Sequence, residues 1–383
     1  MNTIKFVNAQ WGSVMKKTII GLCVVALIAV FGGRAYYLQS QKKTEQVASN
    51  GSDIINVGVL LPLSSFVAKD AQDALIGLNA AQKSINLTNP KKQVRLHIAQ
   101  YIEDSKYTEI GTLSAYNRIA DCDAFILFGE LTTKVLSSRI NEDKKVAISL
   151  VDIDDTPTTT NDYLFRGWYS LDKLASEMAG PVVKMVGDGS IAVLKVKTSD
   201  GDRFAELMKM RMKEANVSVS IVETFPLATT DTKTQVVKIL DKKPSVVVVW
   251  GYGPGYFAAL NSLMELKYNG KIVTGPDIPF NTNLVANNGD GIYYVTLEFN
   301  SDDLKDTREN VYTAFAYESL YILSYAFQNT DKTTEQVRKN LLSSQDFDSI
   351  FGKIHYLPNG NLELPRFEFK QLQADGTSKI IKE

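Results

Sequence analysis

A run of apolar residues from Ile54 to Leu63 leads through a short polar loop into an amphipathic stretch from about Ala68 to Ile85. A buried strand that ends in a small polar loop and continues into a helix is the first unit of an open α/β sheet. In such sheets, ligands bind at the carboxyl ends of the strands, beside helix N-termini. This feature therefore predicts an α/β domain with a ligand site at the strand ends.

The same alternation of apolar strands and amphipathic helices continues along the chain. Further strands are expected at 94–101, 124–128, 146–151, 190–197, 217–224, 245–250, 271–274 and 292–297, and further helices at 108–120, 134–141, 171–185, 203–215, 232–240, 257–266 and 312–327. Buried strands that alternate with helices indicate mostly parallel sheets covered on both faces. The C-terminal part differs, because 353–362 and 366–372 predict a hairpin with Asn359-Gly360 as its turn.

Length and composition exclude several kinds of protein. A chain of 383 residues is too long for one ordinary core and suits two lobes plus an N-terminal extension. The formal net charge of −1 provides no basic field for nucleic acid. The two cysteines and two histidines are widely spaced, so neither a metal site nor a disulfide within the globular part is expected. No cofactor motif is present, and no cofactor is expected.

The N-terminus carries an apolar stretch preceded by Lys16-Lys17. Residues 19–31 have the length of a signal-peptide core. Alternatively, 18–38 spans the bilayer as an anchor with tyrosines at the interface. A lipoprotein interpretation through Cys23 is weaker, because Leu22, and not a small residue, directly precedes that cysteine. Each interpretation exports the remainder of the chain, and the polar residues 39–53 then form a linker.

Several short motifs follow one another along the globular part. They are 57–63 with 72–74, Gly129–Thr133, 147–149, Phe165-Arg166 with Leu174-Ala175, 241–252, Gly275–Asp277, and 351–354 with Asn359-Gly360. Each motif alone is weak, but their order and spacing over roughly 55–376 resemble the branched-chain amino-acid-binding family of type I periplasmic binding proteins.

This resemblance implies two Rossmann-like lobes with mostly parallel sheets, joined by a hinge of several crossovers, with the ligand held in the cleft. Lobe 1 is expected to contain 54–166 plus about 298–345, and lobe 2 to contain 167–297 plus about 346–383. Residues 1–38 form the signal peptide or membrane anchor. The implied protein is not an enzyme. It captures a small cationic or amino-acid-like solute at the periplasmic or extracellular face, and serves a permease of an ABC transporter or a sensor.

The resemblance also assigns candidate site residues. Tyr252 and Asp277 fall on the family positions that surround a ligand ammonium group, and Thr133 keeps a hydroxyl on the carboxylate side. Elsewhere this sequence departs from the family. Asp152 and Asp154 replace small and hydroxyl residues of the third ligand loop, and Asp70 and Asp200 replace aromatic residues.

Several carboxylates in one desolvated cleft repel one another unless a cation balances them. The sequence therefore favours a cationic or amine-rich ligand. The competing interpretation is that most of these aspartates cap helices or lie in solvated loops. Trp168-Tyr169 and Trp250 fall at strand ends or lobe junctions, where they either stack on a ligand or pack in the core.

Two alternative functions fit parts of the sequence. Residues 152–156 resemble the DxDxT motif of haloacid dehalogenase-type phosphatases, with Asp152 as nucleophile, Asp154 as acid/base and Mg²⁺ as counter-ion. That motif lies in mid-chain rather than on the first strand, and Pro157 follows where an apolar residue is usual. The second alternative is a relative that has lost transport and acts as an interaction module in the envelope, because its third loop is altered and the segment after Phe299 is short.

Overall fold

The computed structural model divides the chain into two units, Met1–Asp53 and Ile54–Glu383. It describes residues 53–64, 67–102, 108–152, 162–276, 291–300, 302–305, 310–328, 333–343, 346–365, 367–373 and 377–381. The expected signal peptide or anchor, and the linker up to residue 52, lie outside these ranges. Within them, no helix is both long and apolar enough to cross a bilayer.

The first sheet contains five strands in the order β2-β1-β3-β4-β5. These are β1 (Asp53–Leu61), β2 (Lys92–Gln100), β3 (Ala124–Phe128), β4 (Val146–Leu150) and β5 (Leu164–Arg166). β1 pairs with β3, β3 with β4, and β4 with β5, all in parallel. Every residue of β3 and β4 is buried, as expected for central strands that helices cover on both faces.

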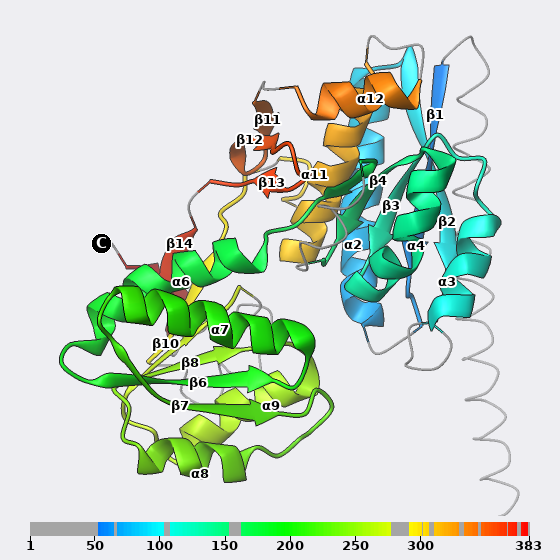
Figure 1. The fold of residues 1–383 in the computed structure, drawn as a ribbon. Coiled ribbons are helices and arrows are strands. Elements are labelled where there is room, and N and C mark those ends of the chain that lie inside the picture. The colour runs from blue at the N-terminus through cyan, green and yellow to red at the C-terminus, as the bar shows by residue number, and fades with distance from the viewer. Residues whose placement is uncertain are drawn as a thin grey trace, which may run out of the picture. The chain divides into compact units, whose positions relative to one another are not determined.

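Two groups of helices cover the first sheet (Figure 1). α2 (Ala68–Thr88) packs along α11 (Val311–Ala326), which also contacts α12 (Thr334–Leu341). α3 (Thr108–Asn117) packs against α4 (Glu130–Asp143). The close approach of α2 to α11 depends on Gly77, because a Cβ atom there would lie 2.0 Å from the Thr313 carbonyl oxygen.

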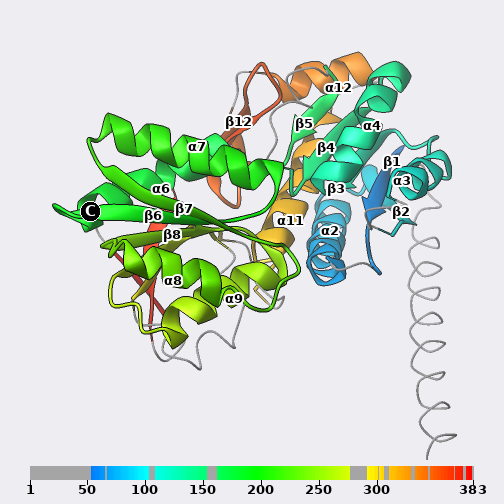
Figure 2. The same ribbon diagram turned by 60° about the horizontal axis from the view of Figure 1, so that its bottom comes forward.

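The second sheet has seven strands in the order β15-β14-β10-β9-β8-β6-β7. They are β6 (Ser190–Val196), β7 (Ser218–Phe225), β8 (Val246–Trp250), β9 (Lys271–Thr274), β10 (Ile292–Thr296), β14 (Glu368–Leu372) and β15 (Ser378–Ile380). The strands from β7 to β10 are parallel, whereas β14 and β15 add antiparallel pairs. α6 (Leu171–Val186) and α7 (Ser199–Glu214) cover one face, and α8 (Lys233–Asp241) and α9 (Gly253–Glu265) cover the other (Figure 2).

The two sheets share one winding order. The strand orders are β2-β1-β3-β4-β5 and, read from the other edge of the second sheet, β7-β6-β8-β9-β10. In each sheet the first strand along the chain lies second from an edge and the next strand forms that edge. The later strands are added on the opposite side, so the direction of winding reverses once. The reversal lies between β1 and β3 in the first sheet and between β6 and β8 in the second. In doubly wound sheets, this switch point is where ligands bind, at the carboxyl ends of the strands.

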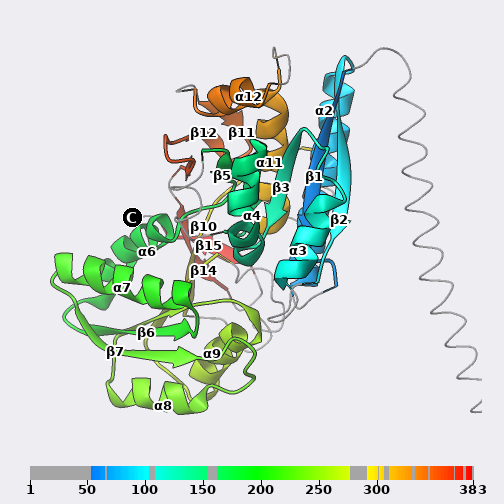
Figure 3. The ribbon, with the colours of Figure 1, turned by 45° about the vertical axis from the view of Figure 1, so that its right-hand side comes forward.

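The chain passes between the two sheets three times, after β5, after β10 and after β13. A separate three-stranded sheet precedes the last crossover and lies beside α11 (Figure 3). It contains β11 (Phe347–Ser349), β12 (Gly352–Tyr356) and β13 (Leu362–Glu363). The predicted α/β architecture with mostly parallel sheets is therefore confirmed.

The predicted C-terminal hairpin is only half right. β12 and β13 do pair around the expected turn, with His355 opposite Glu363. The prediction that 366–372 forms the second limb is wrong, because β14 pairs with β10 and β15 instead. Pro365 has no N–H to donate and ends the short β13, which frees the following residues to join the second sheet.

The guanidinium of Arg166 is fully buried at the first crossover, where its hydrogen bonds fix the path of the chain. Its Nη1 donates to the Asp152 carbonyl oxygen at 2.6 Å, and its Nε donates to Asn361 Oδ1 at 2.9 Å. The backbone N–H of Arg166 donates to the Gly360 carbonyl at 2.8 Å. One side chain thus joins the end of β4, the end of β5 and the turn between β12 and β13.

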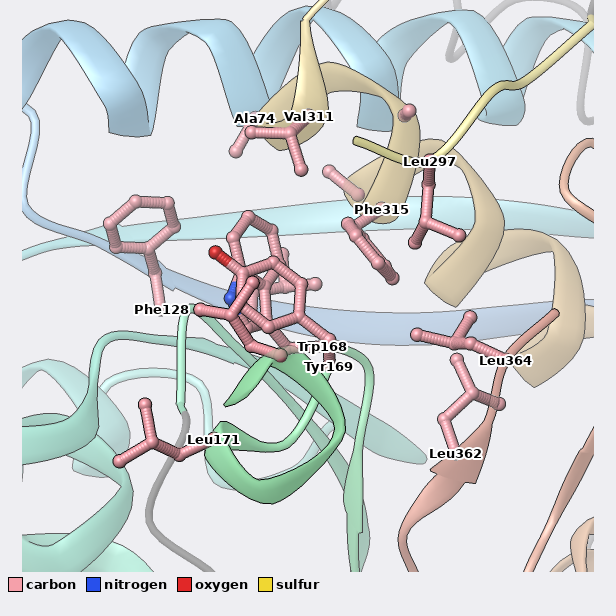
Figure 4. Packing of buried hydrophobic residues seen from close by; sticks show 14 of the residues in the cluster. Ala74, Phe128, Trp168, Tyr169, Leu171, Leu297, Val311, Phe315, Leu362 and Leu364 are labelled. Atoms are coloured by element: carbon pink, nitrogen blue, oxygen red, sulfur yellow. The ribbon is translucent and has the colours of Figure 1, made fainter. Parts of the chain in front are cut away.

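Aromatic and aliphatic side chains from all three crossovers pack into one cluster (Figure 4). Trp168 of the first crossover packs on Phe315 of α11, with ring centroids 4.6 Å apart. Tyr169 meets Phe367 of the third crossover edge to face at 5.8 Å. Leu297, at the start of the second crossover, is buried in the same cluster.

Replacement of Arg166 should be costly. Arg166→Met removes the buried donor from the carbonyl and amide oxygens that it joins, and we expect a loss of about 3–5 kcal/mol in the free energy of unfolding. Urea denaturation measures this loss. Arg118→Met, at an exposed site on the first sheet's side, should change stability by no more than about 0.5 kcal/mol. An equal, small effect of both substitutions would contradict the role given to Arg166.

Glu318 is a second buried charged group, on α11 beneath the small sheet. Its side chain is 2% exposed, and one carboxyl oxygen accepts the Ile350 N–H at 3.1 Å. The other oxygen has no hydrogen-bond partner, and neither has the buried hydroxyl of Tyr356. Burial raises the pKa of the Glu318 carboxyl to about 7.

Glu318 should therefore make stability depend on pH. Between the ordinary pKa of 4.5 and the folded value of about 7, the folded protein binds more protons than the unfolded chain, so the unfolding free energy falls as pH rises. We expect Glu318→Gln to be more stable than the wild type at pH 8, with no such advantage at pH 4.5. Denaturant titrations at several pH values test this. Glu109→Gln, at an exposed position of α3, should follow the wild-type profile.

Candidate functional site

A cavity of about 360 Å³ lies at the carboxyl ends of the strands of both sheets. From the first sheet, its crossovers and its helices, the lining residues are Val67, Asp70, Phe128, Gly129, Glu130, Leu131, Val151, Trp168, Tyr169 and Tyr312. From the second sheet, they are Thr198, Ser199, Asp200, Leu227, Trp250, Gly251, Tyr252, Gly253, Tyr256, Gly275 and Pro276. The cavity thus receives side chains from both halves of the fold.

Both switch points contribute to the lining. In the first sheet, the start of α2 after β1 and the segment from Phe128 to Leu131 after β3 reach the cavity. In the second sheet, residues 198–200 after β6 and 250–253 after β8 do so. The two points at which ligands are expected in doubly wound sheets therefore meet at one hollow.

Three helices that start at the cavity, α4, α7 and α9, begin earlier in the chain than the sequence predicts. α4 begins at Glu130 after Gly129, whose φ is 92°, and α9 begins at Gly253, whose φ is 70°. α7 begins at Ser199, and the Thr198 hydroxyl accepts the Gly201 N–H at 3.2 Å as its cap. Each helix therefore starts at the cavity wall, with its first turn facing the ligand space.

Aromatic rings form much of the wall. Seven lining residues are aromatic, namely Phe128, Trp168, Tyr169, Trp250, Tyr252, Tyr256 and Tyr312. Trp250 stacks on Phe204 with centroids 5.1 Å apart, and stands at 87° to the Tyr252 ring. Trp168 and Trp250 are almost fully buried, and both also line the cavity. Each therefore packs in the core and also borders the ligand space.

Asp200 and Tyr252 lie together on the second sheet's side of the cavity. Asp200 lies in the first turn of α7, is 7% exposed, and its Oδ2 atom has no hydrogen-bond partner. The Tyr252 phenol interacts with the side chains of both Asp200 and Thr198. Burial, and after it the Asp200 carboxylate, raises the pKa of Tyr252, with a further contribution from Glu130. Tyr252 therefore stays protonated and can donate a hydrogen bond.

Asp70 is the corresponding acid on the first sheet's side, in the first turn of α2. Burial raises the pKa of its carboxyl to about 6, and the nearby charge of Asp73 also raises it. The charge of Lys69 and a hydrogen bond with Tyr312 lower the pKa but do not cancel the effect of burial. Asp70 therefore titrates close to neutral pH rather than at 3.8.

Among the described residues, the lining contains acids but no lysine, arginine or histidine. Nearby lysines are engaged elsewhere: Lys69 pairs with Asp73 at 2.9 Å, Lys195 pairs with Asp202 at 2.5 Å, and Lys134 pairs with Glu130. In the described part of the chain, no group of acidic, histidine or cysteine residues could hold a metal ion. The described lining residues carry net negative charge. Lys69 acts on Asp70 and Lys134 pairs with Glu130, whereas no cation among the described residues pairs with Asp200.

The structure brings some of the predicted site residues together and leaves others out. Asp70, Asp200 and Tyr252 line the cavity. Thr133 is fully buried, and its hydroxyl donates to the Gly129 carbonyl at 3.0 Å, within its own helix. Asp152 is also fully buried and does not belong to the lining, so the nucleophile of the phosphatase alternative is not presented to the cavity.

Asp154 and Asp277 lie outside the described residues. Sequence reasoning missed Glu130, Thr198 and Tyr312 as lining residues. Glu130 directly follows the glycine of a recognised motif, which was an available signal. Tyr312 offered none, because it opens a helix whose aromatic spacing is that of core packing.

Asp70 gives the cavity a pH dependence that can be measured without ligand. As pH rises from 3.8 to about 6, the folded protein holds a proton that the unfolded chain releases, so the unfolding free energy falls. Asp70→Asn should therefore be more stable than the wild type at pH 7.5 and lose this advantage near pH 4. Urea unfolding at both values tests this, with exposed Asp188→Asn as the control. An advantage that persists unchanged at pH 4 would contradict the assignment.

Comparison with known proteins agrees with this geometry. The structure resembles LivJ, the branched-chain amino acid transporter substrate-binding protein of Streptococcus pneumoniae in complex with isoleucine, with a TM-score of 0.71 and 17% identity over 86% of this chain and 100% of that one. It resembles a solute-binding protein of an ABC transporter from R. palustris in complex with 4-hydroxybenzoate, with a TM-score of 0.75 and 17% identity over 86% and 96%.

The leucine-binding protein LivK of Thermotoga maritima is similar at a TM-score of 0.72, with 16% identity over 86% of this chain and 98% of that one. A search of curated protein sequences gave no match. The sequence model described as periplasmic binding protein matches residues 54–367. These findings confirm the resemblance inferred from the motifs, and the chain belongs to the periplasmic binding protein family.

Proposed function

We propose that this protein captures a small solute with an amine group in the cavity and presents it to a permease of an ABC transporter or to a sensor. The observation that carries this proposal is the position of the cavity, where the switch points of two sheets with the same winding order face one ligand space. A solute there contacts both halves of the fold at once, so its binding favours the closed arrangement over any open one.

The chemistry of the wall supports an amine. Asp200 and Tyr252 provide a carboxylate and a phenol on one side, and the remaining wall is mainly aromatic and aliphatic. An ammonium group binds well to a carboxylate and to the faces of aromatic rings. The related proteins from S. pneumoniae and R. palustris were found with isoleucine and with 4-hydroxybenzoate, so this fold accommodates solutes of the size that we propose.

We also propose that the apolar segment within residues 1–38 exports the protein. It serves either as a cleaved signal peptide or as an anchor in the inner membrane, and the solute-binding part then works at the periplasmic or extracellular face. This location follows from the family and from the charge pattern around Lys16-Lys17. The permease partner would be a membrane protein, and no nucleic acid is involved.

Thermal unfolding with a library of metabolites tests solute capture. A ligand present at a hundred times its dissociation constant should stabilise the folded protein by about 2.7 kcal/mol. Gly275→Leu provides a structure-based block, because a Cβ there meets only Trp250 Cδ1, at 3.9 Å, and the longer side chain enters the cavity. We expect this variant to fold and to lose the ligand response.

Gly180→Leu is the matched control. Gly180 lies on the exposed face of α6, and a Cβ there has no neighbour within 4 Å. This variant should respond to ligand as the wild type does. If no library member stabilises the wild type, or if Gly275→Leu responds fully, solute capture in this cavity is wrong, and the envelope interaction module becomes the better hypothesis.

A further inference from the structure

We propose that the solute is an arylalkylamine-type cation, a primary amine on an aromatic or apolar body, and that it carries no carboxylate. This inference rests on the proposed function and specifies its ligand class. It separates this protein from relatives whose ligands are amino acids or aromatic acids. Four features of the cavity wall support it.

The first feature is the unsatisfied oxygen of Asp200. This carboxylate is 7% exposed, its Oδ2 has no hydrogen-bond partner, and no salt bridge to it exists among the described residues. Burying a charged group without a partner is unfavourable, and a charge-assisted N–H donor relieves that penalty. Asp200 is a lining residue, so a ligand ammonium group in the cavity lies in the field of this carboxylate and supplies the opposite charge.

The second feature is that three helix N-termini at the cavity carry their own acids. Asp70, Glu130 and Asp200 lie in the first turns of α2, α4 and α7. A helix N-terminus attracts anions through its free N–H groups and its dipole, but here a protein carboxylate already lies in the same first turn. A ligand carboxylate would meet like charge at the starts of α2 and α7, whereas Glu130 at the start of α4 is paired with Lys134. The fourth helix, α9, has Pro254 in its first turn, which removes one N–H donor.

The third feature is that the described wall offers hydroxyl donors but no cationic donor for a carboxylate. Among the residues that the structure describes, no lysine, arginine or histidine lines the cavity. The Thr133 hydroxyl, predicted for the carboxylate side, donates within its own helix. The Thr198 hydroxyl caps α7 and interacts with Tyr252.

The fourth feature is the apolar character of the rest of the cavity. Tyr256 and Phe128 are nearly fully buried lining residues, and Leu227 and Val151 add aliphatic surface. Trp250 and Tyr252 stand edge to face beside the Asp200 corner. This combination suits a ring or a branched alkyl group next to an ammonium, because aromatic faces attract a cation and also pack against an apolar body.

Isothermal titration calorimetry with matched probes tests the proposal. 2-Phenylethylamine lacks only the carboxylate of phenylalanine, and 3-phenylpropionate lacks only its amine. 3-Methylbutylamine and leucine form a second pair. We expect at least one amine to bind ten times or more tightly than its amino acid, and 3-phenylpropionate not to bind.

Asp200→Asn distinguishes a ligand contact from a structural role. The substitution removes a buried, unbalanced charge but keeps the shape, so the ligand-free variant should unfold at a higher temperature than the wild type. Its affinity for the amine should fall at least tenfold. Asp172→Asn is the matched control, because Asp172 also lies in the first turn of a helix on the second sheet, is 51% exposed, and is not part of the cavity lining. It should bind the amine as the wild type does.

The outcomes separate this inference from the proposed function. If phenylalanine or leucine binds more tightly than its amine, or if a library ligand without an amine binds, the inference is overturned, while solute capture stands. Unchanged amine affinity in Asp200→Asn also overturns it. If neither the probes nor the metabolite library stabilises the wild type, both proposals are overturned.

Discussion

The arrangement of the fold depends on a single buried cation at the first crossover. The Arg166 guanidinium is fully buried and donates to groups at positions 152 and 361, which lie far apart in the sequence. A guanidinium can remain inside a protein only when its surroundings supply acceptors with good geometry. The end of β4, the end of β5 and the turn after β12 must therefore keep their relative positions, and this requirement fixes where the chain leaves the first sheet.

The crossovers and the cavity share side chains. Trp168 packs on Phe315 in the cluster that joins the three crossovers, and it also borders the ligand space. Tyr312 stacks against Trp168 at 5.5 Å and lines the same cavity while it interacts with Asp70. A ligand that touches these rings therefore acts on the residues through which the chain passes between the sheets. This provides a physical route from occupancy of the cavity to the arrangement of the two halves.

The central strands and the start of α2 could be predicted from sequence, whereas the other three helix starts at the site could not. The strand at 124–128 is apolar along its whole length because helices cover both faces, and its predicted bounds are those of β3. The predicted helices begin only at residues 134, 203 and 257, later than α4, α7 and α9. Gly129, Asp200 and Pro254, at or next to the observed starts, are unfavourable inside helices and so obscure these starts in the sequence. At an N-terminus the same residues are tolerated, since the first N–H groups have no partner within the helix. These three errors in helix starts therefore lie at the cavity.

The candidate acids were found because they departed from a family pattern, and the structure shows why two interpretations of them coexist. Asp200 lies in a helix N-terminus, as the capping interpretation holds, and it also borders the cavity with an unpartnered oxygen. The helix dipole stabilises an anion by about 0.3–1 kcal/mol, and by up to about 2 kcal/mol when partly buried. Removing a carboxylate from water costs several kcal/mol even after relaxation. The dipole alone does not offset that cost. The Tyr252 phenol that interacts with Asp200 supplies part of the remaining stabilisation, and a cation bound in the cavity would add to it.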